Sequence, residues 1–162
     1  MNKVGVFYIM GGDTSNLKPE WNSKNDIDAY KIVYSPKVKK YAVGLDQTWA
    51  NGGFDYEYML NGLSSSTSAL KLEKDSLIKW KNQPLYVTKN LCMHDVIVLD
   101  AIIHAEEYTF EEKFISVITE GELKGVTMPV KEKEKADGVV HVLVEMCEEK
   151  FKNNFISAMK KL

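Results

Sequence analysis

The sequence predicts an α+β fold in which an antiparallel sheet carries two or three helices packed on one face. Three observations lead to this prediction. Segments rich in β-branched and aromatic residues dominate the first half, turn sequences separate them, and apolar residues recur at helical spacing near residue 150. The chain has 162 residues, the length of one ordinary domain, so we expect a single domain with a loop or hinge at 62–68.

The first sixty residues are expected to form a meander of strands. Gly11-Gly12-Asp13 ends the first strand, Ser35-Pro36 ends the second, and Asn51-Gly52-Gly53 is a strong turn signal before the last. Residues 17–25 contain Pro19 and are predicted to be a loop. The predicted strands are 3–10, 27–34, 38–45 and 54–60.

The middle of the chain combines an ambiguous segment with an apolar one. Residues 69–82 fit either a hairpin or a helix, because their apolar residues alternate like a strand while a helix beginning near Asp75 competes. A short strand is expected at 85–88. Residues 95–105 are rich in Val and Ile, which favours a strand over a helix.

The remaining residues are expected to form two helices and two strands. Thr109 to Glu112 is a capping-box sequence, so we predict a helix over 110–120 that Gly121 ends. The predicted strands are 123–131 and 139–146, joined by a solvated hairpin loop. A final helix is predicted at 148–161, and its buried stripe would consist of Cys147, Phe151, Phe155 and Met159.

Composition and charge exclude several classes of protein. Hydrophobic residues make up 44% and charged residues 27%, as in ordinary globular proteins, and no apolar run is long enough to cross a membrane. The net charge is −2 and every basic residue is lysine, so we expect no nucleic-acid binding. The apolar run after Lys3 lacks a secretory cleavage site, which predicts a cytoplasmic protein. Cys92 and Cys147 have the spacing of neither a disulfide framework nor a zinc site.

Histidines and carboxylates supply the candidates for catalysis. If strands 95–105 and 139–146 are neighbours, a histidine–carboxylate or histidine–histidine pair across them would form a general acid–base couple. A helix over the first segment would instead make Asp100 and His104 neighbours that could share a metal ion, whereas an extended chain separates them too far. The predicted strand therefore argues against a metal site. For an enzyme, the candidate catalytic residues are His94, Asp100, His104, His141 and Glu145.

No cofactor motif is complete. Gly11-Gly12-Asp13-Thr14 follows a strand like the start of a phosphate loop, but the spacing of the established phosphate-binding motifs is missing. We therefore expect no cofactor.

Aromatic and acidic residues favour a binding surface. Ten of the 17 aromatic residues fall within the first sixty positions, with carboxylates between them, and protein interfaces are enriched in such aromatics. We therefore predict a non-enzymatic protein that occupies a basic protein partner, such as an immunity protein, an antitoxin or a phage counter-defence inhibitor. A small-molecule-binding α+β domain and a small hydrolase remain as alternatives. The predicted partner-binding residues are Asp46, Trp49, Asp55, Tyr56, Glu57, Tyr58, Glu106, Glu107, Glu111 and Glu112.

Overall fold

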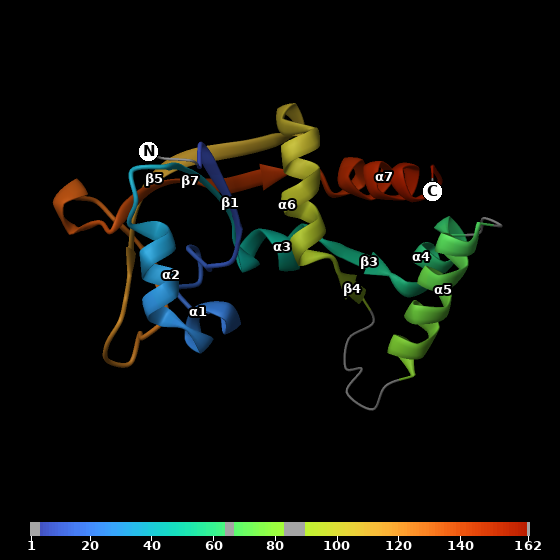
Figure 1. Cartoon of the computed structure of the whole chain (residues 1–162), viewed down its shortest axis with the longest axis horizontal. Helices are drawn as coiled ribbons and strands as arrows, with labels where there is room; N and C mark the ends of the chain where they lie inside the picture. Colours follow the sequence, from blue (N-terminus) through green and yellow to red (C-terminus); the bar gives the residue numbers. More distant parts are fainter. Residues whose placement is uncertain (1–3, 64–66, 83–89, 162) are drawn as a thin grey trace.

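The larger of two sheets is mixed and has five strands (Figure 1). The computed structural model describes residues 4–63, 67–82 and 90–161. The strand order is β1-β2-β7-β5-β6, and β3 and β4 form a separate two-stranded sheet. The strands are β1 Val6–Met10, β2 Lys39–Val43, β3 Gly53–Asp55, β4 Asn90–Cys92, β5 Tyr108–Val117, β6 Thr127–Val130 and β7 Gly138–Met146.

Seven α-helices and two short 3₁₀ turns complete the described part of the chain. None of these helices is both long enough and apolar enough to cross a membrane. Helices α4, α5 and α7 gather beyond one end of the sheet, beside β3 (Figure 1). The elements are α1 Trp21–Asn25, α2 Ile27–Tyr34, α3 Leu45–Asn51, α4 Tyr56–Gly62, α5 Ser68–Lys81, α6 His94–Ile103, η1 Ala105–Glu107, η2 Lys133–Lys135 and α7 Glu148–Met159.

The fold is α+β, but the predicted antiparallel meander in the first half is wrong. Strands β1 and β2 are parallel, and β2 is also parallel to β7. Within the described residues, antiparallel pairing is confined to β5 with β7, β5 with β6, and the small β3–β4 sheet. A parallel pair needs a crossover between its strands, and the segment predicted as a second strand is instead helix α2.

Helix α2 is stabilised by three apolar side chains that lie on one helical face. Ile27, Tyr30 and Tyr34 recur three and four residues apart, and all three pack against the sheet. Asp26 begins the helix, since its carboxylate accepts a hydrogen bond from the Ala29 backbone nitrogen at 3.0 Å. Residues 27–34, predicted as a strand, are therefore a helix that packs against the sheet.

Helices cover both faces of the sheet, so the prediction of helices on a single face is wrong. Ala42 and Val43 are consecutive in β2 and belong to different core clusters. Consecutive residues of a strand point to opposite faces, so the two clusters lie on opposite sides of the sheet. Ala42 packs in the cluster that contains Tyr34 of α2, and Val43 in the one that contains Ile97 of α6.

Three further segments take the opposite structure from the prediction. Residues 95–105 lie mostly in helix α6, which buries Ile97, Val98 and Ala101; such an apolar helix resembles a buried strand in sequence. Most of segment 54–60 lies in helix α4. Segment 110–120 is mostly strand β5, which pairs with β7 on one side and β6 on the other, so its capping-box sequence does not begin a helix.

Other predictions are confirmed. The strands at the start of the chain, at 38–45 and at 139–146 are present as β1, β2 and β7, and the final helix is α7. The ambiguous segment 69–82 is helical within α5.

Two predicted connections differ from the structure. Part of the predicted 17–25 loop forms helix α1. The loop after β6 leads to β7 without a hairpin, because β5 separates the two strands. The strand at 85–88 and part of the hinge at 62–68 lie outside the described residues.

Close packing at the start of β7 makes a testable prediction. A Cβ atom at Gly138 would lie 2.0 Å from the backbone oxygen of Tyr34, and backbone cannot move aside as easily as a flexible side chain. In urea denaturation we expect Gly138→Ala to lower the free energy of unfolding by about 1–3 kcal/mol, the usual cost of overpacking. Gly5→Ala is the matched control, since a Cβ there meets nothing within 4 Å. Equal stability of the two variants would contradict the packing argument.

Candidate active site at the ends of the parallel strands

Two similar loops meet where β1 and β2 end. Each strand is followed by glycine and then by aspartate, in Gly11-Gly12-Asp13 and in Gly44-Leu45-Asp46. The Gly11 nitrogen donates to the Val43 oxygen at 3.0 Å, and the Leu45 nitrogen donates to the Gly12 oxygen at 2.7 Å. Open sheets of parallel strands bind ligands at the carboxyl ends of those strands, so these loops define the candidate site.

Carboxylates hold the two loops in place. Asp46 accepts hydrogen bonds from the Ser15 hydroxyl at 2.6 Å and from the Gln47 nitrogen at 3.1 Å. Asp13 is buried, and its Oδ1 accepts from the Asn16 backbone nitrogen at 2.9 Å and from the Asn16 side-chain nitrogen at 3.0 Å. The site therefore contains carboxylate and amide groups in fixed positions.

Glu20 is a third carboxylate at this end of the sheet. Its Oε2 caps helix α1 by accepting from the Asn22 and Ser23 nitrogens at 2.9 and 3.2 Å. A Cβ at Gly11 would lie 3.6 Å from this oxygen and 2.9 Å from the Tyr30 hydroxyl. The backbone of the first loop thus passes directly over Glu20, which is only 4% exposed.

His94 enters the site from the first residue of α6. Its Nδ1 lies 2.7 Å from the Thr48 hydroxyl and 3.4 Å from the Cys92 sulfur. The ring packs edge-on against Trp49, with ring centroids 4.9 Å apart. Thr48 and Trp49 both belong to α3, which begins directly after β2, so the strand end also positions His94. With Nδ1 engaged, Nε2 is the nitrogen that can face a substrate.

Burial lowers the pKa of His94 below its ordinary value of 6.5, and the carboxylates of Asp95 and Glu20 partly oppose this effect. The imidazole is therefore uncharged at neutral pH. The carboxylate of Glu20, which caps α1, thus interacts electrostatically with His94 at the start of α6.

Cys92 lies beside His94 but has the properties of a structural thiol. Its sulfur donates to the Thr48 backbone oxygen at 3.0 Å, and burial raises its pKa to about 11. A nucleophilic cysteine needs a lowered pKa, so Cys92 supports the position of Thr48 instead.

Of the other catalytic candidates, Asp100, His104 and His141 make their described contacts outside this site. Asp100 and His104 do meet on helix α6, as the helical alternative implied, with a distance of 2.9 Å from Nδ1 to the carboxylate. Among the described residues, no group of three or more His, Cys, Asp and Glu side chains could hold a metal ion. His141 and Glu145 lie on β7, where His141 stacks on Tyr41 with ring centroids 4.9 Å apart.

Asp100 connects three elements of the core. Its carboxylate also accepts from the Tyr108 hydroxyl at 2.6 Å and from the Asn154 side chain at 3.2 Å. These bonds join α6 to β5 and α7, and burial raises the pKa of Tyr108 well above its usual range. The carboxylate is therefore a buried structural acceptor with its partners in place.

The predicted partner-binding residues are divided among several elements. Asp46 and Trp49 lie at the candidate site on α3. Tyr56 is buried in the core, and Glu57 pairs with Lys81 at 3.2 Å. Glu111 and Glu112 are exposed on strand β5 instead of at a helix start. The remaining members are Asp55 and Tyr58, at the beginning of α4, and Glu106 and Glu107, in η1.

The sequence interpretation missed Asp13, Asn16, Glu20 and Thr48 as site residues. One signal was available, since an aspartate stands three residues after the last residue of both β1 and β2. It becomes informative only when the two strands are known to be parallel, because antiparallel strands would place these aspartates at opposite edges of the sheet.

Solved structures of nucleoside hydrolases share this fold. A purine-preferring ribonucleoside hydrolase from Gardnerella vaginalis matches with a TM-score of 0.79 and 21% identity, over 99% of this chain and 53% of its own. A plant nucleoside hydrolase matches with a TM-score of 0.71 and 17% identity, over 96% of this chain and 51% of its own. An inosine-uridine preferring nucleoside hydrolase from Bacillus anthracis gives a TM-score of 0.66 and 17% identity, over 97% and 49%. The chain thus spans about half the length of these proteins.

No curated protein sequence matches the chain, but a family model does. The model of the inosine-uridine preferring nucleoside hydrolases matches residues 1–153. This match overturns the prediction of a non-enzymatic inhibitor, immunity protein or antitoxin, and with it the prediction of a basic protein partner. Small size, acidic clusters and surface aromatics are shared by many enzymes, so they did not discriminate between the two classes. The chain belongs to the inosine-uridine preferring nucleoside hydrolase family.

Proposed function

We propose that this chain forms the His94 side of a nucleoside hydrolase site and acts in hydrolysis of the N-glycosidic bond between ribose and base. The observation that carries the proposal is the family match over residues 1–153 together with the polar site at the ends of β1 and β2. The chain spans about half the length of its solved relatives. Both the cleavage of nucleosides and the preference for inosine and uridine are therefore proposed for this chain.

The reaction requires two kinds of group. Water adds to C1′ of the ribose, the bond from C1′ to the base nitrogen breaks, and the products are ribose and the free base. Charge develops on the departing base, so a proton or hydrogen bond delivered to it lowers the barrier. Positioned acceptors are needed for the ribose hydroxyls, because orientation supplies much of the rate.

His94 is the group proposed to face the base. Thr48 and Cys92 hold its Nδ1 side, and Nε2 remains to hydrogen-bond to the base and exchange a proton with it. Trp49 lies beside His94 with 60% of its surface exposed and offers an aromatic face against which a base can pack.

Carboxylates at the strand ends are proposed to bind the sugar. Glu20 uses Oε2 to cap α1, which leaves Oε1 to accept from a ribose hydroxyl. Asp13 and Asn16 are joined by hydrogen bonds and present further polar groups from the same loop. Ordered carboxylates of this kind select hydroxyl-bearing ligands, because a ligand without the hydroxyls leaves them unpaired.

Nucleoside cleavage provides the direct test. Inosine and uridine are expected to shift the imidazole NMR signals of His94 and to be cleaved to free base and ribose. We expect His94→Ala to reduce the rate of base release by about 100-fold or more, since it removes the group that serves the leaving base. His104→Gln is the matched control, because His104 is bound to Asp100 away from the site. The proposal would be contradicted if inosine and uridine were not cleaved and did not shift the His94 signals. Equal rates of base release in the two variants would also contradict it.

The charge state of His94 provides an independent prediction. An NMR pH titration should place its pKa below 6.5, because burial disfavours the imidazolium. We expect Asp95→Asn to lower this pKa further, since it removes a carboxylate that favours the charged form. Asp28→Asn on α2 serves as the control and should leave the titration unchanged. A pKa at or above 6.5 in the unmodified protein would contradict the described environment of His94.

A further inference from the structure

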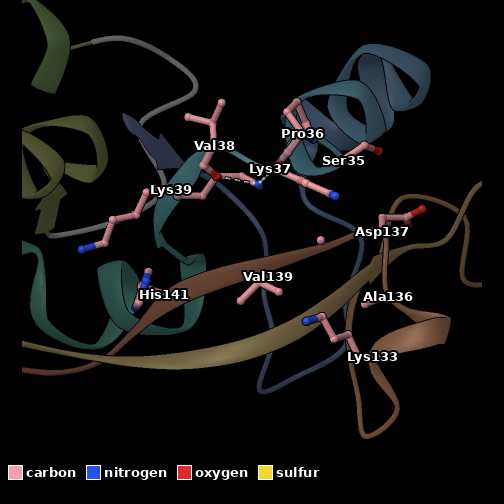
Figure 2. Close-up of a pocket in the computed structure, with 12 residues that line it drawn as sticks. Ser35, Pro36, Lys37, Val38, Lys39, Lys133, Ala136, Asp137, Val139 and His141 are labelled. Atoms are coloured by element: carbon pink, nitrogen blue, oxygen red, sulfur yellow. Dashed lines mark hydrogen bonds between the residues drawn. The ribbon is translucent and has the colours of Figure 1, made fainter. Parts of the chain in front are cut away.

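A cavity of about 610 Å³ lies at the opposite end of the sheet from the candidate active site (Figure 2). Its walls are the loop between α2 and β2 and the segment that runs from η2 into β7. Both β2 and β7 begin here, and the candidate active site lies where β1 and β2 end. The titratable side chains of the lining are Lys37, Lys39, Lys40, Lys133, Asp137 and His141.

The single carboxylate of this lining is already neutralised. Asp137 accepts from the Val117 backbone nitrogen at 2.7 Å and from the Ser116 hydroxyl at 3.4 Å. It also pairs with Lys31 of α2 at 3.2 Å. These bonds hold the loop before β7 against β5 and α2, so Asp137 shapes the wall and contributes little free negative charge.

Lys40 places a buried positive charge in the wall of the cavity. The residue is only 1% exposed, and its ammonium group donates to the backbone oxygens of Pro36 and Val38, the latter at 2.9 Å. Within the described part of the chain, no carboxylate lies within ion-pair distance of it. Carbonyl dipoles solvate an ammonium ion but leave its charge uncancelled, so an anion nearby would be stabilised.

Two more lysines reach the cavity from opposite walls. Lys37 belongs to the loop after α2 and Lys133 to η2, and both are among the residues that line the cavity (Figure 2). Neither forms an ion pair among the described residues. Lys39 is engaged elsewhere, since its ammonium lies 5.0 Å from the centre of the Tyr41 ring. The cavity therefore carries a local excess of positive charge in a protein whose net charge is −2.

We propose that this cavity binds a phosphorylated small molecule, with its phosphate between Lys37 and Lys133 and close to Lys40. Lysine binds phosphate as a point charge, and a phosphate monoester carries enough negative charge to pair with more than one ammonium group. The volume fits a small ligand, and Pro36, Val38 and Val139 provide apolar contact for the part that is not phosphate. The site is separate from the nucleoside site and does not depend on that assignment.

Ribose 5-phosphate is a suitable probe, and ribose is its unphosphorylated control. Calorimetry with the full chain should detect binding of ribose 5-phosphate at low salt, weakening as the salt concentration rises. Ribose, which lacks the phosphate, should leave the NMR signals of His141 in the cavity lining unchanged. We expect Lys37→Ala and Lys133→Ala each to weaken binding about tenfold, a cost typical of losing a charge-assisted hydrogen bond. Lys71→Ala on α5 is the matched control, since this exposed lysine lies outside the cavity.

The histidines report where the ligand binds. His141 lines this cavity and His94 lies in the candidate active site, so ribose 5-phosphate should shift the NMR signals of His141 whether or not those of His94 also move. A shift confined to His94 would overturn the proposal, as would the absence of binding at millimolar ribose 5-phosphate. An equal loss of affinity in Lys71→Ala would also overturn it, because attraction would then reflect overall charge. These outcomes are independent of whether the chain cleaves nucleosides.

Discussion

The parallel pairing of β1 with β2 is the constraint on which the candidate active site depends. The register joins Val6 to Lys39 and Met10 to Val43, so the two strands end at the same level. The glycine–aspartate loops that follow are therefore neighbours, and α3 begins beside them with the threonine that holds His94. An antiparallel pair would separate the same loops by the length of a strand, roughly 16 Å, and no shared site would form.

The two ends of the sheet differ in charge. Carboxylates of Asp13, Glu20 and Asp46 occupy the end where β1 and β2 finish, and lysines surround the cavity where β2 and β7 start. Because the two ends carry opposite charges, the net charge of the chain is only −2 and does not reveal this separation. A polar but uncharged nucleoside suits the first end, since its hydroxyls donate to carboxylates, and an anionic ligand suits the second.

The sequence was a better guide to individual strands than to their order. Val140, Val142, Val144 and Met146 alternate with other residues and correctly predict β7, and the apolar stripe predicts α7, because each pattern is a local property of the chain. The segments that became α2, α6 and β5 were misassigned, since what they pack against decides their structure. His94, Asp46 and Trp49 were singled out, yet no local pattern indicated that they would meet. Glu20 lies within a predicted loop, where the sequence alone does not distinguish a helix-capping residue from a residue of the site.

The position of β7 in the sheet also bears on how the protein folds. Tyr41 pairs with His141, a hundred residues later in the chain, and β7 lies between β2 and β5. Contacts of such long sequence separation require a large loop to close first, which slows folding. During synthesis β2 emerges about a hundred residues before β7, the strand that covers its other edge. Until then β2 has one unpaired edge, and an unpaired strand edge can pair with another chain, so assembly of this sheet is the stage at which the nascent protein is most exposed to aggregation.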